Sequence, residues 1–341
     1  MAANLPETID SVEQLLDVMT TPTDGVRKAV EDLGGEFLVL GAAGKMGPSL
    51  CEMLVRAGAS KVIAVDLFPN PAVRDALAAK GCQTVTCDLL DAGALDGLPD
   101  CGNVLIMTGF KFGASGNPTA MWAMNTLLPA RIVGRFAGSR LLLMSSGNVY
   151  RFVPTASGGA TETDATEPVG EYAQSRLGGE RVAQYVADRQ GTKLVIVRLF
   201  YSVEMRYGII HDLASAVRDG KPIDLAMGYV NQIWQGDANA YLVQFLTLAD
   251  SPARTINITG PEILSVRELA AQIGQRMGRE PVLEGTEADT ALLGNSDEAF
   301  KRFGKPRIAP DQIVQWIVPW VQQGRESLGK PTKYERRDGK F

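Results

Sequence analysis

Apolar and polar positions along the chain follow two different periods, and these periods predict its elements. Short, nearly continuous apolar runs are typical of buried parallel strands. They occur at 36–41, 61–66, 83–87, 103–108, 140–145 and 193–198. Apolar residues at helical spacing lie between them, over about 48–58, 72–80, 118–137 and 170–190. Strands that alternate with amphipathic helices predict an α/β fold with a doubly wound parallel (Rossmann) sheet, covered on both faces.

The two ends of the chain depart from this alternation. Residues 1–35 carry apolar positions at helical spacing, interrupted around Pro22, which predicts two short helices before the first strand. Their apolar stripe is expected to pack on this subunit or on a neighbouring one.

After about residue 200 the pattern loosens. We therefore expect an N-terminal helical extension (1–35), a sheet domain (36–200), a smaller mixed α/β lobe (201–330) and a basic tail (331–341). The strand-like stretch 255–258 is assigned to that lobe, which should cover the carboxyl edge of the sheet, where such folds bind ligands.

Composition narrows the classes of function. The net charge of −5 provides no basic field, which argues against nucleic acid or an anionic membrane as a partner. No apolar run reaches the roughly 20 residues that span a bilayer, and the N-terminus does not resemble a secretory signal. The four cysteines form no C-x-x-C pair, and His211 is the one histidine. Reduced thiols in a cytoplasmic protein are expected, without a metal site or a histidine-dependent hydrolase.

A glycine-rich turn follows the first predicted strand. Gly41, Gly44 and Gly47 open the next helix, and Asp66 ends the following strand, roughly 20 residues further on. In this context the glycines allow a tight turn, close approach of a pyrophosphate and close packing of helix on strand, while the helix N-terminus offers N–H groups to the phosphates. Asp66 would bind the adenosine ribose and repel a 2′-phosphate, which favours NAD over NADP. Lys45 leaves two alternatives open, a cation that attracts that phosphate or a solvated loop lysine.

Further motifs accompany this turn. They are Asp88-Leu89, Asn125, Ser145-Ser146-Gly147-Asn148-Val149-Tyr150, Tyr172-x-x-x-Arg176, Arg198-Leu199-Phe200-Tyr201 and Asn257-Ile258-Thr259-Gly260. Together with the spacing Gly-x-x-Gly-x-x-Gly, they resemble the extended branch of the short-chain dehydrogenase/reductase superfamily, the NAD-dependent epimerase/dehydratase family. The resemblance implies NAD as the cofactor. The residues it assigns to the cofactor are Gly41, Ala43, Gly44, Lys45, Met46, Gly47, Asp66, Leu67, Asp88, Leu89, Thr108, Gly109, Asn125, Tyr172, Arg176 and Leu199.

The same resemblance places the catalytic residues on Ser146, Tyr172 and Arg176. Hydride transfer at a carbinol carbon needs a base for the hydroxyl proton, and a free tyrosine, with a pKa of about 10, is mostly protonated at neutral pH. A cation one helical turn away lowers that pKa, and Ser146 would orient the same oxygen. Arg176 stands where the family has lysine. Arginine keeps the positive charge but does not deprotonate, so it supports the tyrosine without joining a proton relay.

The substrate side departs from the nucleotide-sugar enzymes of that family. Those enzymes usually carry arginines that clamp the diphosphate, whereas 230–237 contains no arginine and 284–290 is acidic. A diphosphate without such a clamp is poorly held. We therefore expect a small-molecule substrate, such as a sugar, a sugar acid or a polyol. The candidate substrate contacts are Lys111, Asn148, Tyr201 and Arg206.

Three functions remain open at this point. The first is an NAD-dependent dehydrogenase that acts on a secondary alcohol. The second is a sugar epimerase or dehydratase that retains NAD through the reaction, and the third is an NAD-binding protein without catalysis, which the replacement of lysine by Arg176 permits. A homodimer is expected in each case.

Overall fold

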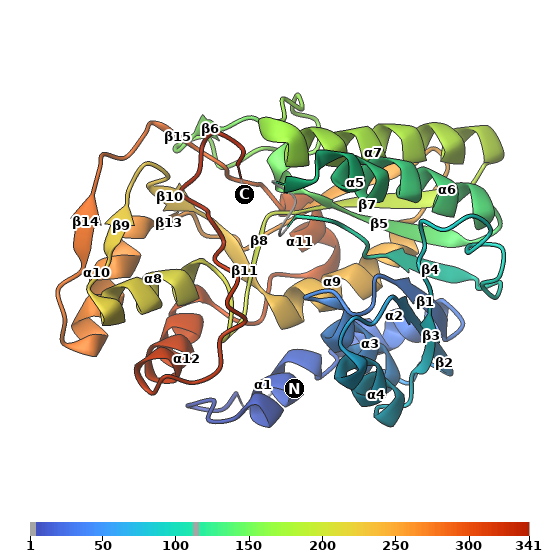
Figure 1. The fold of residues 1–341 in the computed structure, drawn as a ribbon. Helices are drawn as coiled ribbons and strands as arrows, with labels where there is room; N and C mark the ends of the chain where they lie inside the picture. The colour runs from blue at the N-terminus through green and yellow to red at the C-terminus, as the bar shows by residue number, and fades with distance from the viewer. Residues whose placement is uncertain (1–4, 112–115, 341) are drawn as a thin grey trace.

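The central sheet of the computed structural model, which describes residues 5–111 and 116–340, is parallel and doubly wound (Figure 1). Its strand order is β12-β7-β5-β4-β1-β2-β3, and each neighbouring pair is parallel. The strands are β1 (Glu36–Leu40), β2 (Lys61–Asp66), β3 (Gln83–Thr86), β4 (Asn103–Ile106), β5 (Arg140–Ser146), β7 (Lys193–Leu199) and β12 (Arg254–Ile258). The predicted fold class is confirmed.

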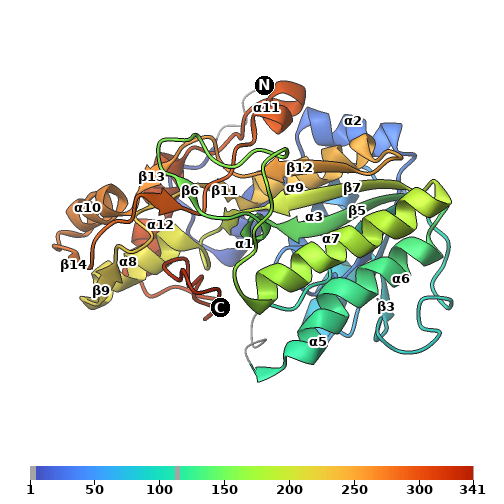
Figure 2. The ribbon, with the colours of Figure 1, turned by 90° about the horizontal axis from the view of Figure 1, so that it is seen from above.

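Helices cover both faces of this sheet because its strands are apolar on both sides. Phe37 and Val39 of β1 join a core with the helices α2 (Asp24–Asp32), α3 (Gly47–Arg56) and α9 (Gln235–Phe245). Leu38 and Leu40, which point the other way, join a core with α6 (Leu128–Arg135) and α7 (Gly170–Gln190). Figure 2 looks onto α6 and α7, which run side by side over the sheet. The helix α4 (Pro71–Ala79) connects β2 to β3.

The helix predicted over 118–137 is interrupted by a π-turn. It consists of α5 (Pro118–Trp122), a π-helical turn η2 (Ala123–Leu127) and α6. Pro129 has no N–H to donate to the carbonyl of Asn125, four residues earlier, so the regular hydrogen-bond ladder cannot continue there. That carbonyl lies against Gly179 of α7, where a Cβ would overlap it. The interruption thus lets α7 pack closely on this helix.

The N-terminal extension packs on its own chain. It forms α1 (Val12–Thr20) and α2, each with a side-chain N-cap, Ser11 and Thr23 respectively. The stripe Leu15 and Met19 of α1 is fully buried, and the helix contacts α3 and α9. Of the two alternatives, packing on this subunit is the one observed.

A second lobe lies beside the carboxyl edge of the sheet (left in Figure 1). Its helices are α8 (Ile209–Asp219), α10 (Val266–Met277) and α12 (Pro310–Gln322), which share one core. Its short strands are β8 (Tyr201–Val203), β9 (Pro222–Asp224), β10 (Tyr229–Val230), β11 (Gln232–Trp234), β13 (Leu264–Ser265) and β14 (Val282–Glu284). The pair β6 (Val153–Pro154) and β15 (Thr290–Ala291) links the sheet domain to the lobe, and α11 (Asp297–Phe303) follows. The assignment of 255–258 to this lobe was wrong, because β12 pairs with β7 as the edge strand of the main sheet.

The C-terminal segment, residues 324–340, folds back over the lobe, and we call it the C-terminal strap. In Figure 1 it runs, in dark red, along the boundary between lobe and sheet. Thr332 donates from its backbone N–H and its hydroxyl to Asp212 Oδ2, at 2.8 and 2.6 Å. Arg337 donates to the carbonyl and hydroxyl oxygens of Thr290, at 2.7 Å each. The expected tail is therefore an ordered part of the lobe. Within the described ranges, no helix is both long and apolar enough for a membrane span.

Candidate functional site

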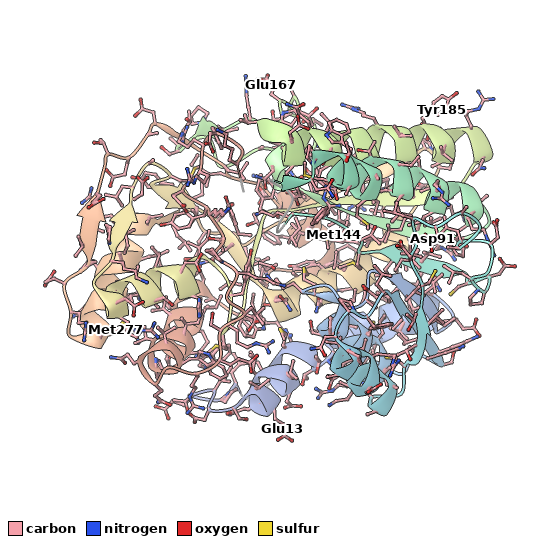
Figure 3. The ribbon with its side chains drawn as sticks, viewed as in Figure 1. Glu13, Asp91, Met144, Glu167, Tyr185 and Met277 are labelled. Carbon is pink, nitrogen blue, oxygen red and sulfur yellow. The ribbon has the colours of Figure 1, made fainter. Side chains whose placement is uncertain are left out.

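A cleft at the carboxyl edge of the sheet contains most of the predicted site residues. Two cavities meet in it, and both are lined by Gly41, Gly44, Met107 and Gly109. The first lies over the ends of β2 and β3, and the second reaches across β5 and α7 to the second lobe. Met144, near the end of β5 and labelled in Figure 3, lines the second cavity. A cleft of this form suits an elongated ligand that lies across the sheet edge.

Asp66 lies in the first cavity, together with Leu67, Asp88 and Leu89. Its carboxylate accepts hydrogen bonds from the backbone N–H groups of Ala43, at 2.9 Å, and of Phe68, at 3.3 Å. These two bonds fix the carboxylate beside the glycine turn. Two acidic side chains at this end of the cleft suit ribose hydroxyls and oppose an added phosphate.

The glycine turn meets the steric requirements of a dinucleotide. A Cβ on Gly41, whose φ is +87°, would lie 2.8 Å from the backbone nitrogen of Thr108, and a Cβ on Gly47 would overlap the carbonyl of Ala42. These two glycines serve internal packing. Gly44 is different, because a Cβ there would approach only the carbonyl of Gly41, at 3.3 Å, and would otherwise project toward the cleft. Bare backbone at Gly44, in the turn that precedes α3, fits a pyrophosphate.

Ser146 and Tyr172 face each other in the second cavity. The Ser146 hydroxyl donates to Asn148 Oδ1 at 3.0 Å and accepts from the Asn148 N–H at 3.2 Å. Burial by itself raises the pKa of the Tyr172 phenol. The charges of Arg176 and Lys111 and hydrogen bonds with Arg176 and Ser146 outweigh it, so the pKa lies below its ordinary value of 10.0. A buried phenol of this kind is suited to act as a base.

Arg176 extends beneath Tyr172 to the ends of two strands. Its Nη1 donates to the carbonyls of Thr108, at 3.1 Å, and Met144, at 3.3 Å. Its guanidinium carbon lies 5.6 Å from the centre of the Tyr172 ring. Among the described residues, Arg176 Nε and Thr108 Oγ1 are buried without a hydrogen-bond partner. Arg176 lines the second cavity and Thr108 the first, so a polar ligand that spans both cavities would pass these two residues.

Lys45 fits neither of the alternatives considered from the sequence. Its side chain is partly buried, and its Nζ donates to the carbonyl and hydroxyl oxygens of Ser202, at 3.0 and 2.8 Å. It also lies 3.8 Å from the centre of the Tyr207 ring. Lys45 therefore points into the second cavity, away from Asp66. A solvated loop lysine is excluded, and so is a cation placed beside the adenosine ribose.

A buried polar network lies behind the second cavity and supports it. Arg198 forms an ion pair with Glu180 of α7, at 2.7 Å, and donates to the Tyr150 hydroxyl, also at 2.7 Å. The Tyr150 hydroxyl in turn donates to Asn257 Oδ1 at 2.9 Å. Ser145, beside Ser146, donates to Glu180. Because β5, β7, α7 and β12 are tied together in this way, the backbone that carries Ser146 is held rigidly.

The remaining predicted residues divide between the cleft and its surroundings. Met46, Lys111, Leu199 and Tyr201 line the second cavity, and Thr108 lines the first. Asn125 lies behind the cleft, where its amide exchanges hydrogen bonds with the backbone of Phe110, at 2.8 and 3.1 Å. Arg206 does not line the cleft, because Glu204 and Glu326 hold its guanidinium.

The sequence-based assignment missed several residues of the second cavity, among them Phe110, Ser202, Tyr207 and Lys330. Phe110 follows directly on Gly109, and Ser202 follows Tyr201, so their positions after predicted strands were available as a signal. Lys330 belongs to the C-terminal strap, and nothing in its local sequence indicates that the strap reaches the cleft.

Comparison with known proteins relates this fold and site to one family. The model of the NAD dependent epimerase/dehydratase family matches residues 37–226, from β1 into the second lobe. No curated protein matches the sequence.

Solved structures resemble the chain over most of its length. MoeE5 in complex with UDP-glucose and NAD is 21% identical, with a TM-score of 0.69 over 85% of this chain and 99% of that one. UDP-glucuronic acid 4-epimerase from Bacillus cereus with NAD is 18% identical, with a TM-score of 0.70 over 84% and 96%. DesIV, a dTDP-glucose 4,6-dehydratase from Streptomyces venezuelae with NAD and TYD bound, is 19% identical, with a TM-score of 0.72 over 84% and 97%. At these identities the likeness shows a shared fold.

Proposed function

The chain belongs to the NAD-dependent epimerase/dehydratase family, an extended branch of the short-chain dehydrogenases/reductases, and we propose that it is an NAD-dependent oxidoreductase that acts on a secondary alcohol or ketone of a small hydroxylated substrate. The family match confirms the predicted family and its cofactor, NAD. One observation carries the proposal. Ser146, Tyr172 and Arg176 lie together in the cavity that continues the glycine-turn cleft.

Each of these residues has a distinct part in the proposed reaction. Bound NAD supplies the hydride acceptor. Ser146 donates a hydrogen bond to the reacting oxygen, and the Tyr172 phenolate removes the proton of that hydroxyl as the carbon–oxygen double bond forms. Arg176 favours the phenolate by its fixed charge, which stabilises the form of Tyr172 that acts as a base. In the reduction direction the Tyr172 hydroxyl returns the proton.

The position of the C-terminal strap favours the proposal of a small substrate over that of a nucleotide sugar. The structural neighbours were solved with UDP-glucose, UDP-glucuronic acid or TYD. In this chain, Arg336 and Gly339 of the strap line a small cavity together with Phe152 and Met227, beside Asn148 and Tyr201. Gly339 packs so closely on Gly170 that a Cβ on Gly170 would lie 2.5 Å from its carbonyl oxygen. A long substrate leaving the second cavity on this side would meet the strap.

A substrate screen with Tyr172→Phe as the control variant tests the proposal. NAD reduction is followed with sugars, sugar acids, polyols and nucleotide sugars. Tyr172→Phe should keep the affinity for NAD and lower kcat by about two orders of magnitude or more, because only the acid/base group is removed. A variant that keeps near-normal kcat would place the base elsewhere.

The same screen separates the other two functions. An epimerase or dehydratase that retains NAD would convert its substrate without net release of NADH, which product analysis detects. An NAD-binding protein without catalysis would bind NAD and convert none of the panel. Turnover of a nucleotide sugar in preference to every small substrate would overturn the assigned substrate class.

We also propose a homodimer that forms through α7 and the adjacent π-turn. Leu127 is 53% exposed, Tyr185 62% and Val182 40%, and Tyr185 projects outward from α7 (Figure 3). Large apolar side chains gathered on neighbouring helices favour burial against a partner. The cytoplasmic location stays a prediction from composition.

A further inference from the structure

Three neighbouring strands of the main sheet place polar side chains in one row beneath α7. Ser145 of β5 is aligned with Arg198 of β7, and Arg198 with Asn257 of β12. All three residues are buried, with exposures of at most 5%. Two positions earlier on the same face, β5 and β7 carry Leu143 and Ile196, which belong to the apolar core under α7. Buried polar groups at this level of the sheet require partners, and α7 provides one.

The partner from α7 is the carboxylate of Glu180. Arg198 donates to it from Nε to Oε1 at 3.1 Å and from Nη2 to Oε2 at 2.7 Å, and the Ser145 hydroxyl donates to Oε1. Only 4% of the Glu180 side chain and 7% of the Arg198 side chain are exposed. A bidentate pair with an additional hydrogen bond fixes the carboxylate in one orientation. Glu180 thereby joins α7 to β5 and β7 at one point.

Glu180 shares a face of α7 with the two predicted catalytic residues of this helix. It follows Arg176 by four residues and Tyr172 by eight, and all three are buried. Arg176 donates to a carbonyl of β5, and Glu180 accepts from Ser145 of the same strand. Ser146 is the next residue of β5. These two attachments of α7 to β5 therefore determine how Tyr172 lies relative to Ser146.

The same ion pair also supports an aromatic side chain of the second cavity. Arg198 Nη1 donates to the Tyr150 hydroxyl at 2.7 Å. The ring of Tyr150 stacks on that of Phe200, with the ring centres 6.0 Å apart and the planes 11° apart. Phe200 lines the second cavity, and a Cβ on Gly147, the residue after Ser146, would overlap its ring. A change in the ion pair would therefore reach the cavity by two routes, through β5 and through Phe200.

We propose that Glu180 is a positioning residue, which fixes the distance and the orientation of Tyr172 on α7 relative to Ser146 on β5. Glu180 is not among the described residues that line either cavity, so it acts through Ser145 and Arg198. The inference rests on the proposed function, in which Ser146 and Tyr172 contact one substrate oxygen. Proton transfer requires heavy-atom distances of about 2.6–3.2 Å, and a displacement of about 1 Å lowers rates by about 100-fold.

The ionisation of Tyr172 reports this alignment without a substrate. The groups that interact with its phenol are Arg176, Lys111, Ser146 and Tyr207. Glu180→Gln removes a negative charge, which by itself would lower the pKa of Tyr172. Lost alignment acts in the opposite direction, because it weakens the hydrogen bonds with Arg176 and Ser146 that lower this pKa. The sign of the shift therefore separates positioning from direct electrostatics.

Spectroscopic titration of the NAD-loaded protein tests the proposal. The ultraviolet absorption of phenolate is followed against pH for each protein and for the same protein with Tyr172→Phe, and the difference isolates Tyr172. Glu180→Gln should raise the pKa of Tyr172 by about 0.5 or more. Asp188→Asn, which neutralises an exposed carboxylate on the same helix, should leave it unchanged. A pKa that falls or stays the same in Glu180→Gln would overturn the proposal.

Ser145→Ala keeps the test decisive if Glu180→Gln does not fold. Glu180→Gln leaves the Arg198 guanidinium buried without its counter-charge, which is destabilising, whereas Ser145→Ala removes only one hydrogen bond. Thermal melting identifies the folded variants. Ser145→Ala should also raise the pKa of Tyr172, by a smaller amount. If Ser145→Ala is the only folded variant and the pKa of Tyr172 is unchanged in it, the proposal is wrong.

Kinetics with the substrate found in the screen provide a second readout and distinguish the two proposals. Glu180→Gln should lower kcat about tenfold or more and leave the KM for NAD within about twofold of the wild type. A wild-type kcat in Glu180→Gln would refute the positioning role and leave the oxidoreductase intact. A raised pKa of Tyr172 in Glu180→Gln, with a wild type that converts no compound of the panel, would support the alignment by Glu180 and count against the oxidoreductase.

Discussion

The guanidinium of Arg176 occupies the space that a side chain on residue 109 would need. A Cβ on Gly109 would overlap Arg176 Nη2 and lie 2.7 Å from its Cζ. Gly109 also borders both cavities of the cleft. Because residue 109 is glycine, the arginine that stands where the family has lysine can reach the carbonyls of Thr108, just after β4, and of Met144 in β5.

This contact predicts that Gly109→Ala acts through Arg176. The added methyl should push the guanidinium from its two carbonyls and lower kcat/KM about tenfold or more, which corresponds to about 1.4 kcal/mol. In the background of Arg176→Lys, where the side chain is shorter, the same change should cost much less. A double-mutant cycle on kcat/KM measures the coupling. Additive effects of the two changes would mean that the contact has no catalytic role.

Much of the fold followed from local patterns. The apolar runs of β1 and β5 are buried on both faces, so each residue contributes to a strand pattern that is visible without knowledge of its partners. The glycine turn was equally accessible, because the positive φ of Gly41 and the contact of Gly47 with Ala42 arise within the strand–turn–helix unit itself. Asp66 was found for the same reason, since it ends the strand that pairs directly with β1.

The features that were missed depend on contacts between distant segments. β12 has five residues, as many as β1, but it follows elements of the second lobe in the sequence, and only its pairing with β7 reveals that it belongs to the main sheet. Lys45 lies in the glycine turn, but its side chain contacts Ser202 of β8, which is 157 residues away in the sequence. Lys330 reaches the cleft because Thr332 of the strap is bound by Asp212 of α8. No periodicity in the sequence predicts these contacts between distant segments.

Asp66 should make the protein prefer NAD over NADP. We expect NAD to bind at least tenfold tighter, about 1.4 kcal/mol, because the carboxylate would lie against an added 2′-phosphate. Asp66→Asn should raise the affinity for NADP and lower that for NAD, whereas Asp75→Asn, on the exposed side of α4, should change neither. Binding titrations with both cofactors provide the measurement. Equal affinities of the wild type for NAD and NADP would contradict this role of Asp66.

The N-terminal helices should contribute directly to the stability of the chain. Leu15 is completely buried, so Leu15→Ala should lower the free energy of unfolding by about 2–5 kcal/mol. Glu13→Ala, on the exposed face of the same helix, should change it by less than about 0.5 kcal/mol. Urea denaturation of the two variants and the wild type measures the difference. Deletion of residues 1–30 should have a larger effect than either, and an unchanged melting temperature would contradict the packing role.

The proposed dimer can be tested on α7. Val182→Glu combined with Tyr185→Glu should convert the protein to a monomer, since the charges would be buried in the interface. Val282→Glu, at a residue of β14 that is 44% exposed, serves as the matched control and should leave the assembly unchanged. Light scattering coupled to size-exclusion chromatography gives the mass of each variant. A wild-type protein that is monomeric at all concentrations would refute the interface.

The last prediction concerns the charge beside Tyr172 and its effect on the pH profile. Oxidation requires the phenolate, so kcat/KM should rise with pH through the pKa of Tyr172, which lies below its ordinary value of 10.0. Arg176→Met removes the strongest of the influences that lower this pKa. The rise in rate should therefore shift to higher pH, and the rate near neutral pH should fall.

The variant Arg176→Lys tests whether a positive charge at this position is sufficient for catalysis. Lysine keeps the positive charge and can also join a proton relay, so this variant should retain the pH profile within about one unit and keep or raise the rate. Arg181→Met, which removes an exposed arginine from the same helix, should leave the profile unchanged. The measurement is kcat/KM against pH for the wild type and the three variants, with the substrate found in the screen. If Arg176→Met and the wild type gave the same profile and rate, the guanidinium would serve only to tie α7 to the strand ends. The base would then owe its reactivity to Lys111, the other cation that lowers the pKa of Tyr172.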